Sequence, residues 1–264
     1  MQAYHSHPVF CLDVVGTQNA HSLVSVSTDG RLCSWNLDSV LDTQDDVIDL
    51  SSVGAAKGIA PTCMSFPAND INNLIVGSED GSVYQVSRLA AKQDKVSEPY
   101  VLPGYSGPVT GLQFHPSKSS AEFANLFLSS STDWTVKLWS VQEKQPLMVL
   151  DYFDDYVYDV QWSPVHPALF ATADGLGNLD FWNLIHDTEV PYTSITVREG
   201  KTAINKIRWN SSGTMVAAGD ADGHISVFEL RERLYAPGND ASLQMRDVLA
   251  DVGPSQSDAD RQPQ

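Results

Sequence analysis

A nine-residue motif that recurs five times constrains the fold of this chain more than any other feature. Each copy begins with a tight, usually acidic turn and continues into a strand that ends on an aromatic or apolar residue. The copies occupy residues 27–35, 78–86, 131–139, 174–182 and 220–228, and their last residues lie 43 to 53 positions apart. A period of roughly 40–50 residues with an aromatic-ended strand is typical of propeller blades. We therefore predict an all-β propeller of about five four-stranded blades.

Two further strands are predicted in each blade. An alternating strand lies about 25 residues before the end of each motif, and its period of two suits a strand packed between sheets, at residues 9–14, 62–66, 109–114, 157–162 and 204–209. A second strand leads directly into the turn of the repeated motif, at residues 23–26, 74–76, 126–129, 169–172 and 215–218. Glycine suits the turn because it reaches positive φ without steric cost. Trp134 replaces that glycine in the third copy, which predicts an aromatic loop tip, and Leu176 replaces the aspartate in the fourth.

The repeats divide the chain into three parts. We predict propeller blades over residues 1–237, a short C-terminal helix or extension over 238–252 and a disordered tail over 253–264. Residues 231–236 are expected to form the last outer strand, before Pro-Gly breaks the chain. The apolar spacing that follows suits a helix, whereas the Pro, Ser, Asp and Gln of the last residues suit disorder.

The net charge limits the class of partner, and the cysteines and the N-terminal residues indicate the cellular location. The net charge of −17 disfavours nucleic acid and anionic membranes, because both would be repelled. Cys11, Cys33 and Cys63 are not spaced as metal ligands and are expected to be reduced, buried thiols. The apolar run at residues 9–12 is too short for a signal sequence or a membrane span, so a cytoplasmic location is the default expectation.

The sequence carries no recognisable catalytic motif. Residues 104–107 lack the spacing of a nucleophile elbow, and residues 54–58 are far from a phosphate-binding loop. Residues 220–223 resemble the start of a calcium loop, but Arg231 stands where the closing glutamate is needed. The seven histidines are scattered without the spacing of a helical zinc site. We therefore predict no catalytic residue, cofactor or metal, and an enzyme built on a propeller is the least favoured interpretation.

Surface recognition is the remaining function, and two kinds of side chain are candidates for it. Trp134, Tyr156 and Tyr158 are aromatics that could anchor a partner, although the two tyrosines could instead pack between blades. An acidic cluster, with Asp154 and Asp155 as its candidate contacts, could steer a basic partner helix or simply be a solvated face. The full cluster is Asp151, Asp154, Asp155 and Asp159.

Taken together, these motifs resemble the WD-repeat family. Over about residues 5–240 the chain is similar, more specifically, to the C-terminal propeller of the cytoplasmic dynein intermediate chains. The strings that carry this likeness lie at residues 7–9, 14–21, 133–139, 155–160, 162–170 and 187–191. The resemblance implies that a hydrogen-bonded set of His, Ser or Thr, Asp and Trp braces each well-formed blade. The first copy supplies His5, Ser25, Asp29 and Trp35. The third supplies Ser129, Asp133 and Trp139, with Tyr105 where the histidine would fall.

The resemblance also implies a function. It predicts a non-catalytic intermediate-chain subunit of cytoplasmic dynein, associated with the cytoskeleton, whose propeller docks on the tail of the motor heavy chain and supports microtubule-based cargo transport. Family members carry an N-terminal region that binds dynactin and light chains, and they have more than five blades. We therefore expect those sites and one or two blades to be missing, and we expect no direct grip on the acidic microtubule. The alternative is a general WD-repeat scaffold or adaptor for another multiprotein complex.

Overall fold

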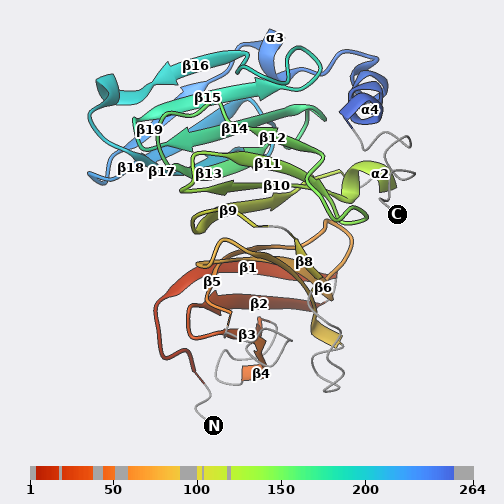
Figure 1. The fold of residues 1–264 in the computed structure, drawn as a ribbon, viewed down its shortest axis with the longest axis vertical. Coiled ribbons are helices and arrows are strands. Elements are labelled where there is room, and N and C mark those ends of the chain that lie inside the picture. Colours follow the sequence, from red (N-terminus) through yellow and green to blue (C-terminus); the bar gives the residue numbers. More distant parts are fainter. Residues whose placement is uncertain are drawn as a thin grey trace, which may run out of the picture.

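Five antiparallel sheets follow one another in chain order around a common axis (Figure 1). The computed structural model describes residues 4–17, 20–37, 44–50, 59–89, 100–102, 104–117 and 120–252. The predicted tail at 253–264 lies outside the described residues. The all-β propeller class predicted from the repeats is confirmed.

Four of the sheets are four-stranded meanders, whose innermost strand comes first. The first contains β1 (Val9–Thr17), β2 (Ala20–Ser27), β3 (Arg31–Asn36) and β4 (Gln44–Asp49). The second contains β5 (Pro61–Ser65), β6 (Asn73–Ser78), β7 (Val83–Ser87) and β8 (Tyr100–Leu102). The third contains β9 (Val109–Phe114), β10 (Leu126–Ser131), β11 (Val136–Ser140) and β12 (Met148–Leu150). The fourth contains β13 (Val157–Trp162), β14 (Leu169–Asp174), β15 (Asn178–Asn183) and β16 (Thr193–Thr196).

The fifth sheet has three strands, which corrects the expectation of four. It contains β17 (Ile204–Trp209), β18 (Met215–Asp220) and β19 (Ile225–Glu229). The segment expected to form its outer strand contains a short helix instead, α3 (Glu232–Tyr235). The Leu234 N–H donates to the Arg231 carbonyl and the Ala236 N–H donates to the Glu232 carbonyl, so these backbone groups close helical turns. Leu234 is buried against the sheet, which favours the helical position.

The remaining helical segments are short. They are α2 (Ala121–Ala124), the 3₁₀ turn η2 (Val197–Gly200) and α4 (Ala241–Val252). Helix α4 lies beside α2 (Figure 1), and its Met245 is fully buried in the core between the third and fourth sheets. In the described part of the chain, none of the helices has both the length and the apolar character that a membrane span requires.

The aromatic end of the motif strand forms a cross-strand pair. Trp139 of β11 lies directly opposite Phe127 of β10, and their rings stack with centroids 6.0 Å apart. Trp182 and Phe170 repeat this arrangement in the fourth sheet, with centroids 5.9 Å apart. All four side chains are fully buried. Aromatic pairs of this kind stabilise a sheet beyond the area that they bury, which is why the motif strand ends on tryptophan in these copies.

Four buried clusters fill the seams between consecutive sheets. Among the described residues, none of these clusters joins the fifth sheet to the first. Phe10 and Leu12 are exposed on β1, and Val227 and Ile225 are exposed on β19, the latter by 75%. The ring is therefore open between its first and last sheets, as expected of a partial propeller.

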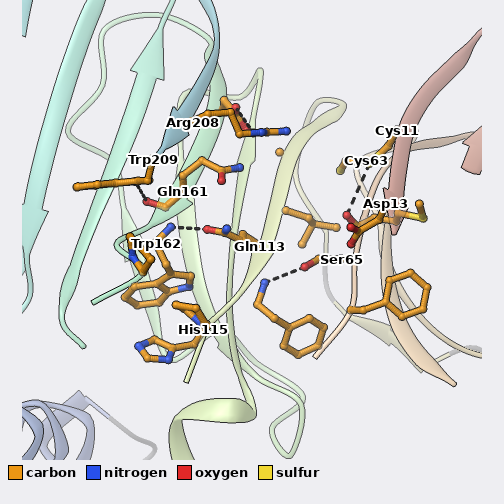
Figure 2. Close-up of a pocket in the computed structure, with 18 of the residues that line it drawn as sticks. Cys11, Asp13, Cys63, Ser65, Gln113, His115, Gln161, Trp162, Arg208 and Trp209 are labelled. Carbon is orange, nitrogen blue, oxygen red and sulfur yellow. Dashed lines mark hydrogen bonds and ion pairs between the residues drawn. The ribbon is translucent and has the colours of Figure 1, made fainter. Parts of the chain in front are cut away.

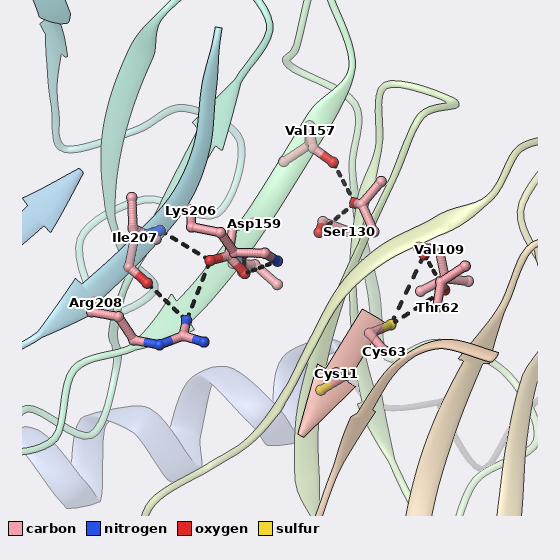
Figure 3. A network of polar contacts seen from close by, with 12 residues as sticks. Cys11, Thr62, Cys63, Val109, Ser130, Val157, Asp159, Lys206, Ile207 and Arg208 are labelled. Carbon is pink, nitrogen blue, oxygen red and sulfur yellow. Dashed lines mark hydrogen bonds and ion pairs between the residues drawn. The ribbon is translucent and has the colours of Figure 1, made fainter. Parts of the chain in front are cut away.

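Hydrogen bonds between the innermost strands also join neighbouring sheets (Figure 3). Thr62 on β5 donates its hydroxyl to the Val109 carbonyl on β9. At the last seam, Asp159 on β13 accepts the Ile207 N–H at 3.0 Å and lies 3.4 Å from Arg208 Nη1 and 3.5 Å from Lys206 Nζ. Asp159 is only 2% exposed, so this member of the acidic cluster is a seam residue and does not lie on a solvated face.

Candidate interaction surfaces

The four residues proposed to brace the first sheet lie together in the structure. His5 Nε2 and Ser25 Oγ are 2.7 Å apart, and the other ring nitrogen lies 3.1 Å from an Asp29 carboxylate oxygen. The His5 ring also packs against Trp35, with centroids 6.4 Å apart. Burial opposes the charged form of Asp29, but hydrogen bonds from Ser6 N–H and His5 hold its pKa below the usual range. These contacts tie the segment before β1 to the Asp-Gly turn.

A tyrosine takes the place of the histidine in the third sheet. The Tyr105 hydroxyl contacts Ser129 Oγ, which also accepts the Trp139 Nε1–H at 2.7 Å. Asp133 accepts the Ser106 N–H at 3.0 Å, as Asp29 accepts the Ser6 N–H in the first sheet. Burial raises the pKa of Tyr105, so this phenol stays neutral. A neutral hydroxyl therefore makes the contact to serine that the imidazole makes in the first sheet.

Trp134 occupies the tip of the β10–β11 turn and is 48% exposed. Its φ of 71° places it in the left-handed region, close to the φ of Gly81 and Gly223 at the same turn position. A residue with a side chain pays roughly 1–2 kcal/mol for that conformation. An exposed aromatic held in a strained backbone is a reason to look for function at this turn.

Replacing Trp134 with glycine is expected to raise the free energy of unfolding by about 1 kcal/mol, because glycine adopts this φ without a Cβ clash. Urea denaturation of the two proteins, followed by circular dichroism, measures the difference. Trp134→Ala is the matched control: it removes the indole but keeps the Cβ, so it should gain little. A loss of stability in Trp134→Gly would mean that the indole contributes packing that outweighs its strain.

The other predicted contact residues lie at the start of β13. Tyr156 is 45% exposed and meets the partly buried Tyr158 edge to face, with centroids 6.2 Å apart. Asp155 accepts the Tyr156 N–H at 2.7 Å, and Asp154 is exposed next to it. We call Trp134, Asp154, Asp155, Tyr156 and Tyr158 the turn-tip surface. The tyrosines contact each other at the edge of the fourth sheet, and Trp134 belongs to the turn of the third.

An acidic pocket beside Asp154 was not predicted from the sequence. It has a volume of about 210 Å³, and its lining includes Tyr152 and Leu176 as well as the buried carboxyls of Asp174 and Asp180. Burial raises the pKa of Asp180 to about 6, while a hydrogen bond from Ser194 opposes the shift. Asp180 lies on a strand whose alternation gives no sign that a carboxyl is buried there.

Replacing Asp180 with asparagine is expected to stabilise the fold at neutral pH. A folded pKa raised to about 6 contributes stability below the unfolded pKa, and that stability is lost as pH rises through about 6. The gain should be about 3 kcal/mol at about pH 7.5 and should shrink to about 1 kcal/mol at about pH 4.5. Urea unfolding at both pH values measures it, with the exposed Asp154→Asn as control. A gain that is independent of pH would contradict the assignment.

A pocket lies on the propeller axis, between the innermost strands of the sheets (Figure 2). This axial pocket has a volume of about 510 Å³, and the innermost strands of all five sheets contribute to its lining. Trp209 Nε1–H donates to the Gln161 carbonyl at 3.2 Å, whereas the buried Trp162 Nε1–H has no hydrogen-bond partner among the described residues. Burial raises the pKa of the Cys63 thiol to about 12 and also raises that of Cys11, so both lining thiols are protonated at neutral pH.

The described lining of the axial pocket contains no cluster of metal ligands. Throughout the described ranges, no three His, Cys, Asp or Glu side chains gather as ligands. His115 is buried, accepts the Ser117 N–H and lies 2.9 Å from the Pro167 carbonyl, so both ring nitrogens are used structurally. The axial pocket is therefore a space with polar lining residues between the innermost strands of the five sheets.

Comparisons with known proteins agree with this architecture. The family described as "WD domain, G-beta repeat" matches residues 97–140 and 192–229. The cytoplasmic dynein 1 intermediate chain of Drosophila melanogaster is 48% identical over 256 residues, which cover 97% of this chain and 38% of that protein. A chain in the crystal structure of a mitotic checkpoint complex superposes with a TM-score of 0.63 at 16% identity, covering 85% of this chain and 63% of its own length, and so shares the fold alone.

The chain thus spans less than two fifths of the length of the curated relative. The matched repeats, the open ring of sheets and the identity along nearly the whole chain lead to one assignment. The chain contains WD repeats, and its sequence is similar to that of the cytoplasmic dynein 1 intermediate chain.

Proposed function

We propose that this chain is a non-catalytic intermediate-chain subunit of cytoplasmic dynein, which docks on the tail of the heavy chain and supports microtubule-based cargo transport. The observation that carries the proposal is the 48% identity to a cytoplasmic dynein 1 intermediate chain along 97% of the sequence. The proposal places the chain in the cytoplasm, in a cytoskeleton-associated complex.

The turn-tip surface is the part of the fold that we assign to docking. It combines two exposed aromatics, Trp134 and Tyr156, with the carboxylates of Asp154 and Asp155. Aromatic side chains commonly anchor interfaces, and a net charge of −17 favours encounter with a basic partner segment. The strain at Trp134 supports the same role, since the fold would be more stable with glycine there.

Affinity capture tests this proposal. Tagged chain of residues 1–264 is incubated with cytosolic extract, and bound dynein heavy chain is quantified by mass spectrometry. The double variant Trp134→Gly/Tyr156→Ala should recover at least about tenfold less heavy chain, the loss expected when interface anchors are removed. Val149→Ala, an exposed apolar position on β12, is the matched control and should bind normally. A stoichiometric partner other than dynein subunits would contradict the proposal and favour a general WD-repeat scaffold.

A further inference from the structure

A second pocket lies on the opposite side of the sheets from the Asp-Gly turns. It has a volume of about 560 Å³ and lies where the loops that follow β9 and β13 meet α2 and the start of α4. We call it the underside pocket; its polar lining comprises His115, Ser117, Ser120, Ser163, His166, Ser242 and Arg246. No described Asp or Glu side chain lines it, although the whole chain carries a net charge of −17.

His166 is a mostly buried residue that presents a donor without a protein acceptor to the pocket. The residue is only 5% exposed, and its Nδ1 accepts the Ala168 N–H at 3.2 Å. The neutral ring therefore carries its proton on Nε2, and this N–H has no hydrogen-bond partner among the described residues. Burial lowers the pKa of His166, which keeps the ring neutral near pH 7 and Nε2 a donor. Nε2 is not one of the fully buried atoms that lack a partner, so it opens into the pocket and its N–H is available to donate to a ligand.

The serine hydroxyls of the pocket have hydrogens left to donate. Ser117 Oγ accepts the Ser120 N–H at 3.2 Å, and Ser163 Oγ accepts the His166 N–H at 3.2 Å. Ser120 Oγ accepts the Phe123 N–H at the N-terminus of α2. In each of these bonds the hydroxyl oxygen is the acceptor. Because a serine hydroxyl both accepts and donates, each of the three retains one O–H for another acceptor.

An arginine that is paired with a glutamate borders the same pocket. Arg246 Nε lies 3.0 Å from the Glu122 carboxylate, and its guanidinium lies 5.9 Å from the centre of the Phe123 ring. This contact uses one of the donors of Arg246 and leaves its two terminal NH₂ groups. Ser242 belongs to the first turn of α4, whose dipole favours an anion. The donors and the charge therefore select the same kind of ligand.

We propose that the underside pocket binds an oxyanion group, phosphate or carboxylate, carried by a peptide side chain of a partner. His166 Nε2–H and the Ser163 hydroxyl bind the oxygens at the buried end, and Arg246 binds them at the mouth. Such charge-assisted hydrogen bonds are among the stronger polar contacts in proteins. The site is independent of the turn-tip surface and of the dynein proposal.

Titration of the full chain with inorganic phosphate, and separately with acetate, tests this site at constant ionic strength maintained with chloride. The ring signals of His166, followed by NMR, should move and saturate. Ser242→Glu places a carboxylate at the pocket and should weaken phosphate binding at least about tenfold. It should not destabilise the fold, because an acidic residue is favourable in the first turn of a helix. Gln142→Glu is the matched control: it adds the same charge at an exposed position away from the pocket and should bind phosphate normally.

The outcomes separate the two sources of the oxyanion. Stronger binding of phosphate than of acetate supports a phosphorylated side chain as the ligand, and comparable binding supports an acidic side chain. Arg246→Gln provides a second variant and should weaken binding of both probes. If the His166 signals do not move with either probe, or if Ser242→Glu and Arg246→Gln bind phosphate as well as the unmodified chain does, the proposal is overturned.

Discussion

Replacing Trp139 with alanine is expected to lower the free energy of unfolding by about 3–5 kcal/mol. Its indole is fully buried, stacks on Phe127 and donates Nε1–H to Ser129. The substitution leaves a cavity between the second and third sheets and removes a hydrogen-bond partner from Ser129, which also contacts the Tyr105 hydroxyl. Urea denaturation followed by circular dichroism measures the loss.

The same repeat copy supplies the matched control. Trp134 lies five residues earlier at the exposed turn, and Trp134→Ala removes an indole of the same size without opening a buried cavity. We expect this variant to change stability by less than about 1 kcal/mol. Equal losses at the two positions would contradict the view that one tryptophan holds the sheet together while the other faces solvent.

Replacing Gly81 with alanine is expected to be the second most damaging change, at about 3 kcal/mol or more. Gly81 has a φ of 84°, and a Cβ there would lie 2.4 Å from the Tyr105 carbonyl oxygen and 2.8 Å from that of Gly107. Both oxygens belong to the loop that leads into the third sheet. The glycine is thus needed for its turn conformation and for the close approach of the next blade.

Gly223→Ala separates these two requirements. Gly223 occupies the same turn position in the fifth sheet with a φ of 85°, but a Cβ there has no neighbour within 4 Å. Its replacement should cost only the strain of the left-handed backbone, about 1–2 kcal/mol. The difference between the stability losses of Gly81→Ala and Gly223→Ala measures the cost of the clash between the new Cβ at position 81 and the loop that leads into the third sheet. If the two losses of stability are equal, the close contact between the Gly81 turn and the following loop does not contribute to the stability of the fold.

The repeated features of this fold are those that the sequence predicts best. The turn motif specifies its own conformation locally, because Asp accepts backbone N–H groups and Gly takes a positive φ, as in Asp80 and Gly81. The aromatic end of the motif strand predicts a buried position, and Trp139 and Trp182 occupy one. Five copies of a local signal at blade spacing are sufficient to predict a propeller and its order of sheets.

Features that depend on distant parts of the chain could not be predicted. Asp159 looks like a member of an exposed acidic cluster, yet its partners Lys206 and Arg208 lie almost fifty residues away in sequence. The buried state of Asp180 depends in the same way on neighbouring loops. The donor on His166 is visible only once the loops and α4 are in place. In each case the local sequence pattern is that of a surface residue. Only tertiary packing decides whether the side chain is buried.

The fifth sheet shows another limit. Residues 232–235 could be read as strand or helix, because segments this short carry little periodic signal. The helix places Leu234 in the core between the fourth and fifth sheets, a tertiary contact that the sequence does not reveal.

The most direct test of the functional account is equilibrium binding of purified chain 1–264 to a purified tail segment of the cytoplasmic dynein heavy chain. Circular dichroism first establishes that the chain is folded, and analytical ultracentrifugation at about 10 μM of each protein then measures the complex. We predict a one-to-one complex that Trp134→Gly/Tyr156→Ala weakens at least about tenfold and Val149→Ala leaves intact. A folded chain that sediments alone in the presence of the tail segment would contradict the account.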